Sequence, residues 1–246
     1  MNLSGISNRT LFGRLIRSPL KLIPRSAVVP ILQGPLRGKK WIAGSSTHGC
    51  WVGSFEYEKQ LAFRRTVSRG DVVYDLGANV GFYTLLASVL AGEAGHVYSF
   101  EPLAANAAIL RRHLEMNRIR NCTVFQEAVA ASDGTARFDP SSSGDLARLS
   151  ETGTETVKTV ALDSLFAVGQ LRAPRVVKID VEGAELEVLR GAVRLMEAHR
   201  PVILLATHGA EVHAGCVKLL CDRGYRLESL TVDPMEISAE ILARPQ

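Results

Sequence analysis

The sequence has no apolar run that approaches the roughly 18–20 residues of a membrane-spanning helix. It also lacks a compact N-terminal apolar stretch followed by a small-residue cleavage site, so we expect no secretory signal. Only four of the 246 residues are cysteines, and they form neither a CxxC pair nor a zinc-ligand spacing. We therefore expect reduced, mostly buried thiols and a cytoplasmic protein.

Acidic residues are absent from the first 55 positions, which hold eight lysines and arginines. Because the whole chain has a net charge of +4, residues 56–246 must sum to −4. Two interpretations of the basic segment are open. It could make peripheral contact with an anionic membrane surface or a polyanionic substrate, or it could be a solvated arm.

Proline and glycine recur through residues 1–40 and break regular elements. We predict a basic irregular arm there, with one short helix near residues 8–17. Residues 41–70 form a lead-in, with a Gly/Ser-rich hairpin over 41–51 and a helix over 55–68. Residues 71–246 hold the main domain.

Beyond residue 70, short apolar runs alternate with amphipathic segments. The pattern predicts strands over 71–75, 96–100, 122–127, 175–180, 201–206 and 225–231, and helices over 80–91, 103–117, 184–197 and 211–223. Strands with helices between them predict an α/β fold with a mostly parallel sheet and helices on both faces. Residues 132–160 interrupt the alternation with turn signals and short strands over 136–138 and 157–160, and such an insertion could cover the active-site edge.

A polar residue ends or follows five of the predicted strands: Asp75, Glu101, Glu127, Asp180 and His208, in chain order. In open α/β sheets, ligands bind outside the carboxyl ends of the strands. These five side chains therefore predict a pocket for a cofactor and a substrate.

Residues 75–81 read D-L-G-A-N-V-G and follow a short apolar run. A dinucleotide fold prefers G-x-G-x-x-G, whereas here Asn79 holds the second glycine position and Asp75 stands two residues before Gly77. A carboxylate there would repel a pyrophosphate but suits a cationic ligand such as S-adenosylmethionine. We expect Gly77 to let the backbone approach the cofactor and Gly81 to let the helix pack close to the strand.

Three segments together resemble the FkbM-type S-adenosylmethionine-dependent methyltransferases: residues 74–84 (Y-D-L-G-A-N-V-G-F-Y-T), 100–102 (F-E-P) and 178–185 (K-I-D-V-E-G-A-E). The third is the specific one. The resemblance implies a Rossmann-like class I methyltransferase fold, whose seven-stranded sheet ends in an antiparallel hairpin. It also implies O-methyl transfer to a hydroxyl of a sugar, glycolipid, polyketide or related natural product.

The resemblance assigns site residues position by position. The methionine part of the cofactor would be lined by Asp75, Gly77, Asn79 and Gly81, the ribose hydroxyls would bind Glu101, and the adenine would lie near Glu127 and Ala128. Asp180 would sit beside the transferable methyl group.

His208 is the candidate general base, because an imidazole has an intrinsic pKa near 6.5. Asp180 competes with it, as a base or as a group that orients the acceptor hydroxyl. Many family members carry an acid just before this histidine, but here the residue is Thr207. If that acid orients the histidine elsewhere, its help is missing here. Asp180, Glu182 and His208 could also bind a divalent ion, but nothing in their spacing requires one and we predict none.

Three other functions are considered. A DNA methyltransferase that methylates an amino group would carry an Asp/Asn-Pro-Pro-aromatic motif where this chain has D-V-E-G at 180–183. The net negative charge of residues 56–246 also argues against any nucleic-acid partner. The second alternative function is an NAD-dependent dehydrogenase, and the third is a binding protein that keeps the fold without catalysing a reaction. The sequence names neither the acceptor nor the oligomeric state.

Overall fold

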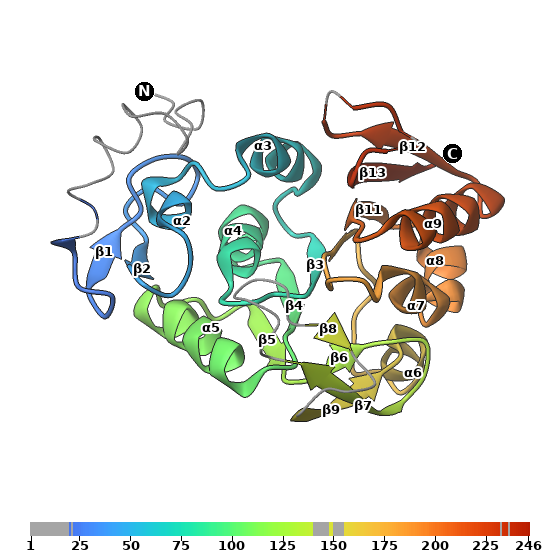
Figure 1. Ribbon diagram of the computed structural model, residues 1–246, viewed down its shortest axis with the longest axis horizontal. Helices are drawn as coiled ribbons and strands as arrows, with labels where there is room; N and C mark the ends of the chain where they lie inside the picture. Colours follow the sequence, from blue (N-terminus) through green and yellow to red (C-terminus); the bar gives the residue numbers. More distant parts are fainter. Residues whose placement is uncertain (1–19, 21, 140–147, 150–154, 232, 236) are drawn as a thin grey trace.

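The computed structural model describes residues 20, 22–139, 148–149, 155–231, 233–235 and 237–246, so the helix expected near residues 8–17 lies outside the described residues. The main element is a seven-stranded sheet (Figure 1). Its strands, in spatial order, are β12 (Tyr225–Ser229), β13 (Glu240–Pro245), β11 (Val202–Ala206), β10 (Val176–Ile179), β3 (Val72–Leu76), β4 (His96–Phe100) and β5 (Cys122–Phe125).

The sheet is parallel except for one strand. β13 pairs antiparallel with both β11 and β12, whereas β11, β10, β3, β4 and β5 pair in parallel. The predicted mostly parallel α/β sheet is therefore confirmed, as is the closing antiparallel hairpin. The central strands β10 and β11 are buried at every position; β11 reads as an unbroken apolar run, whereas Lys178 interrupts the run of β10.

Two large hydrophobic cores lie on the two faces of the sheet, and alternate residues of β3 enter each of them. Val73 packs in the core that includes helix α4 (Phe82–Ala91), whereas Tyr74 and Leu76 pack in the opposite core. This alternation is the two-residue period of a strand with both faces covered. In Figure 1, α4 and α5 (Ala104–Met116) lie on one side of the sheet. The other side carries α6 (Leu162–Ala167), α7 (Glu185–Arg190), α8 (Val193–His199) and α9 (Ala210–Asp222).

The single helix predicted over 184–197 is two helices, α7 and α8. A Cβ on Gly191 would lie 2.1 Å from the carbonyl oxygen of Ala130, so the backbone at this point passes too close to a neighbouring loop for any side chain. Asp163 then starts α8 by accepting hydrogen bonds from the amides of Arg194 and Leu195, at 3.0 and 2.8 Å. The periodicity of the apolar residues hides this break because both helices face the same core.

The insertion after β5 forms a second, four-stranded sheet in the order β6-β9-β7-β8. Its strands are β6 (Ala128–Val129), β7 (Gly134–Asp139), β8 (Arg148–Leu149) and β9 (Glu155–Val160). The two short strands predicted in this stretch are confirmed as parts of β7 and β9.

The hairpin predicted over 41–51 is wrong. β2 (Lys40–Ile42) instead pairs antiparallel with β1 (Val28–Pro30), and residues 48–52 form helix α2 (His48–Val52). The reason is Trp41, which is fully buried and stacks on His113 of α5, with 3.8 Å between ring centroids. This contact anchors β2 to the main domain and leaves an edge that β1 can pair. The predicted lead-in helix is present as α3 (Tyr57–Thr66).

Candidate active site

The site lies at the carboxyl ends of β3 and β10, which are neighbours in the sheet. From β3 the chain builds outward through β4 and β5, and from β10 it builds in the other direction through β11. Such a reversal opens a crevice beyond the strand ends. Gly77 has φ +76°, and a Cβ on it would lie 1.8 Å from the carbonyl oxygen of Asp180. Glycine is therefore required here for the two strand-end loops to meet.

A cavity of about 440 Å³ occupies this crevice. Its wall includes most of the predicted site residues: Gly77, Asn79, Glu101, Glu127, Ala128, Asp180, Glu182 and His208. The lead-in contributes Thr47, Cys50, Phe55, Glu56 and Lys59, and β13 contributes Glu240. Of the five strand-end residues, Glu101, Glu127, Asp180 and His208 therefore line one cavity, whereas Asp75 does not.

Asp75 and Gly81 lie behind the cavity wall. Asp75 is fully buried, accepts a 2.6 Å hydrogen bond from the Thr84 hydroxyl and lies 3.5 Å from the ammonium group of Lys178. A Cβ on Gly81 would lie 2.8 Å from the side chain of Leu110, so this glycine allows α4 to approach α5 rather than a strand. Both residues shape the loop from behind.

Glu101 is a buried carboxylate at the end of β4 that organises the glycine loop. It accepts hydrogen bonds from the amides of Asn79 and Leu103, at 2.8 and 3.0 Å, and from the side chain of Asn106 at 3.3 Å. Burial raises the pKa of Glu101, and these three donors oppose that rise. Asn79 has φ +48°, a left-handed conformation that asparagine tolerates, and its amide can thereby point at Glu101.

Glu127 lies just beyond β5, between the two sheets. One of its oxygens pairs with the ammonium group of Lys158 at 2.5 Å. The other, Oε2, is buried and has no hydrogen-bond partner among the described residues. A buried carboxylate oxygen without a donor is costly, so this atom marks a place where a bound molecule could donate a hydrogen bond.

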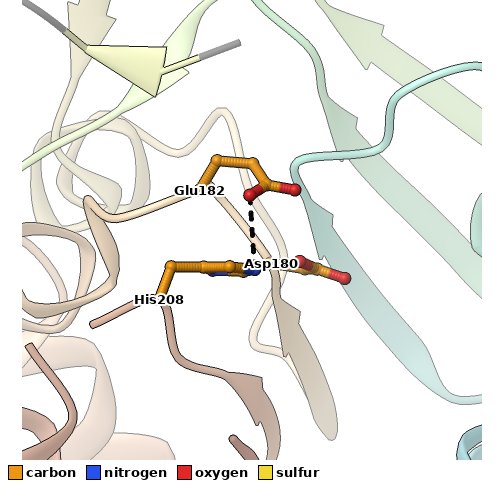
Figure 2. A group of neighbouring side chains, drawn as sticks. All are labelled: Asp180, Glu182 and His208. Carbon is orange, nitrogen blue, oxygen red and sulfur yellow. Dashed lines mark ion pairs between the residues drawn. The ribbon is translucent and has the colours of Figure 1, made fainter. Parts of the chain in front are cut away.

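His208 follows β11 and faces three carboxylates. Its Nδ1 donates to Oε1 of Glu185 at 2.8 Å, and its Nε2 lies 3.3 Å from Glu182 and 3.9 Å from Asp180 (Figure 2). The hydrogen bond to Glu185, with the charges of Glu182 and Asp180, raises the pKa of His208 against the opposing effect of burial. Carboxylates cannot donate to Nε2, so this arrangement favours the imidazolium in the unliganded site.

Thr207 precedes His208 in the sequence, but His208 has an acidic partner in space, Glu185. This carboxylate is fully buried at the start of α7, and the same Oε1 also accepts hydrogen bonds from the amides of Val181 and Gly183. Its position is therefore fixed by backbone groups as well as by the histidine. The expectation that orienting help is missing for His208 does not hold, because Glu185 holds its Nδ1.

Asp180 is held by two ammonium groups. Lys59 and Lys178 both lie near its Oδ2, at 3.3 and 3.4 Å. Burial alone would raise the pKa of Asp180, but the charges of Lys178 and Lys59, with His208, lower it to about 2. Asp180 is therefore ionised throughout the neutral range, with Oδ2 engaged by the lysines and Oδ1 turned toward His208.

Lys59 is the site residue that sequence reasoning missed most completely. It comes from α3 and is buried, and it also pairs with Glu56 at 3.2 Å and Glu240 at 2.7 Å. The ring of Tyr83 lies 5.9 Å from its ammonium group. No local pattern could have identified this contact, since 121 residues separate Lys59 from Asp180. The sequence places Lys178 two residues before Asp180, but it does not show that Lys178 is buried against Asp75.

Asp180, Glu182 and His208 bring possible metal-ligand atoms within 4.8 Å of one another. The imidazolium accounts for this geometry without a metal, since one positive ring lies between the carboxylates. The two ammonium groups beside Asp180 would also repel a dication. We therefore keep the prediction that this site works without a metal.

The methyltransferase FkbM domain model matches residues 75–227, more than half of the chain. The chain belongs to the FkbM methyltransferase family. The hexuronic acid methyltransferase AglP of Haloferax volcanii is 34% identical over 149 residues, and the 31-O-demethyl-FK506 methyltransferase FkbM of Streptomyces tacrolimicus is 32% identical over 155 residues. These matches cover 59% and 50% of this chain, but only 57% and 59% of the two relatives.

Solved structures agree on the fold. The methyltransferase FkbM of Methylobacillus flagellatus superposes with a TM-score of 0.51 at 17% identity, over 80% of this chain and 53% of that one. An rRNA-methylase structure from Clostridium thermocellum gives a TM-score of 0.52 at 13% identity, over 76% and 92%. The fold is the Rossmann-like class I methyltransferase fold that the sequence predicts.

Proposed function

We propose that this protein transfers a methyl group from S-adenosylmethionine to a hydroxyl of a sugar, glycolipid or related natural product. The observation that carries the proposal is the juxtaposition of Asp180 and His208 at the mouth of the glycine-loop crevice. The acceptor class is supported by the relatives, one named for a hexuronic acid and one for a demethylated FK506.

The residues present fit the proposed cofactor. Glu101 retains acceptor capacity for ribose hydroxyls beyond its three donors, and the unpartnered Oε2 of Glu127 could accept from the amino group of an adenine. The carboxylates of Asp180 and Glu182 suit a ligand with ammonium and sulfonium charges. When bound, S-adenosylmethionine supplies an activated methyl group on a sulfonium.

The protein's part in the reaction is to position the acceptor and accept its proton. His208 in its neutral form takes the hydroxyl proton at Nε2, while Glu185 holds Nδ1 and stabilises the imidazolium that results. Oδ1 of Asp180 orients the hydroxyl, and Lys59 and Lys178 keep that carboxylate ionised and fixed. A general base of this kind contributes roughly 10²–10⁴-fold, and alignment contributes more.

The test has two parts. Thermal-shift titration should show stabilisation by S-adenosylhomocysteine and none by NAD, and the reverse result would mean that the cofactor is a dinucleotide. Incubation with methyl-labelled S-adenosylmethionine and a panel of sugars, glycolipids and polyketide alcohols should then label an oxygen of one class. Cofactor binding without transfer to any acceptor would favour a binding protein instead.

A further inference from the structure

Exposed apolar side chains gather in the segment that precedes the lead-in of this protein, over residues 22–32. Among the described residues, the exposed large hydrophobic side chains are those of Leu22, Val28, Leu32, Val168 and Ile237. Three of these five lie within eleven residues, and Leu22 is 84% exposed. Single exposed apolar residues are ordinary, but a local group of them marks an interaction surface.

The β1–β2 ribbon shows how these side chains share a face. Val28 and Pro30 are exposed and Val29 between them is not, and the alternation continues through buried Ile31 to exposed Leu32. Residues opposite each other in an antiparallel pair project to the same side, so Lys40 lies beside Pro30 on this face. We call the exposed residues Val28, Pro30, Leu32 and Lys40 the ribbon face.

The opposite face of the ribbon is anchored to the main domain. Val29 pairs with Trp41, which is fully buried against His113 and Phe82. The ribbon therefore cannot turn its apolar side chains inward, and β1 and β2 lie at one edge of the molecule (Figure 1). The outward direction of the ribbon face is set by the fold.

The charged residues of the chain segment that forms this face have one sign. Arg25, Arg37, Lys39 and Lys40 have no ion-pair partner within the described part of the chain, and the first acidic residue of the sequence is Glu56. Uncompensated cations beside aliphatic side chains match an anionic bilayer, whose headgroups attract the cations while its interface accepts the apolar groups. A nucleic acid would use the cations but would offer little to Val28 and Leu32.

We propose that the ribbon face, together with Leu22, docks on an anionic lipid surface. The site is separate from the cofactor crevice, and the proposal does not depend on the methyl acceptor. Each lysine or arginine near an anionic surface strengthens binding by about five-fold, and the aliphatic side chains add a contribution that salt does not screen.

Co-sedimentation of the full chain with vesicles tests the proposal. We expect binding to phosphatidylcholine vesicles that contain about one third phosphatidylglycerol, and little binding to phosphatidylcholine alone. Replacing Leu22, Val28 and Leu32 by serine together should reduce the vesicle partition coefficient at least ten-fold, with most of the loss persisting at high salt. Lys40→Glu should reduce it by at least about five-fold.

Val168→Ser is the matched control, because Val168 is 69% exposed but lies far from residues 22–40 in the sequence and outside the ribbon face, and it should leave vesicle binding unchanged. Binding of S-adenosylhomocysteine and circular dichroism report whether each variant is folded. Absence of binding to anionic vesicles would overturn the proposal. So would binding that the triple serine variant does not weaken, or stronger binding to RNA than to vesicles, since either would show that charge alone determines the partner.

Discussion

Lowering the pH should destabilise this protein through one buried side chain, His113 of α5. This residue is fully buried and stacks on Trp41. Its Nδ1 lies 2.8 Å from the carbonyl oxygen of Val80 and must donate to it, and its Nε2 lies 3.1 Å from the amide of Ile42 and must accept. The neutral ring therefore satisfies both neighbours, whereas a proton on Nε2 would face the amide hydrogen of Ile42 and break that bond.

The size of this loss of stability follows from the difference between the pKa of His113 in the folded and the unfolded protein. Burial lowers the pKa of His113 to about 4, against the opposing effect of the bond to Val80, whereas an unfolded chain has a value near 6.5. Between these values the unfolded state binds more protons, so the contribution is complete above about pH 6.5 and is lost as the pH falls toward 4. The difference between these two pKa values corresponds to about 3 kcal/mol of stability in full, of which about 2 kcal/mol is lost by pH 5.

The assay is urea unfolding of the wild type and of His113→Gln, from about pH 7.5 to about pH 5. The variant is neutral throughout, so the difference in unfolding free energy between the two proteins should shrink by about 2 kcal/mol over this range. Other titrating groups, such as His208, act equally in both proteins and cancel. If that difference stays constant as the pH falls, the protonation argument is refuted.

The site gives four further predictions. His208→Gln should lower kcat by roughly 10²–10⁴-fold with binding of S-adenosylhomocysteine unchanged, and in the wild type kcat should rise with pH through a pKa above 6.5. Glu185→Gln should move this rise in kcat to lower pH, because it removes the largest cause of the raised pKa of His208. A rise in kcat that stays at the same pH would exclude His208 as the base. Gly77→Ala should lower the unfolding free energy by at least about 2 kcal/mol more than Gly183→Ala. Gly183 also has a positive φ, but a Cβ there would meet open space. Equal losses of stability would mean that only the backbone angle matters. Methyl transfer should survive treatment with EDTA, and activity that disappears and returns with magnesium would show that Asp180, Glu182 and His208 hold an ion.

The parts of the fold that the sequence predicts are those with a short-range signal. The buried strands β3, β10 and β11 are visible as apolar runs, and the rule that ligands bind at strand ends predicts that Asp180 and His208 lie close together. Turns and breaks are harder to predict. The break between α7 and α8 falls at Gly191, and the sequence does not show that this glycine lies against the carbonyl of Ala130 in a distant loop.

The electrostatics of the site are the least predictable part. The sequence shows Asp180 in a recognisable run of residues, but not the two lysines that lower its pKa. Likewise the sequence shows Glu185 in the same run of residues, but only the structure reveals that it holds Nδ1 of His208, which lies 23 positions further on. Long-range ion pairs carry no periodicity, so they appear only once the chain is folded.

The family match begins at residue 75 and ends at residue 227, and Lys59 and Glu240 lie on either side of it. Lys59 contacts the Asp180 carboxylate directly and Glu240 pairs with Lys59, so part of the charge around Asp180 comes from outside the matched segment. Substitution in the lead-in helix or in the last strand can change the charge around Asp180 while every motif residue stays the same. The pKa of Asp180 in this protein therefore depends on its lead-in helix as well as on the motif that holds Asp180 and Lys178.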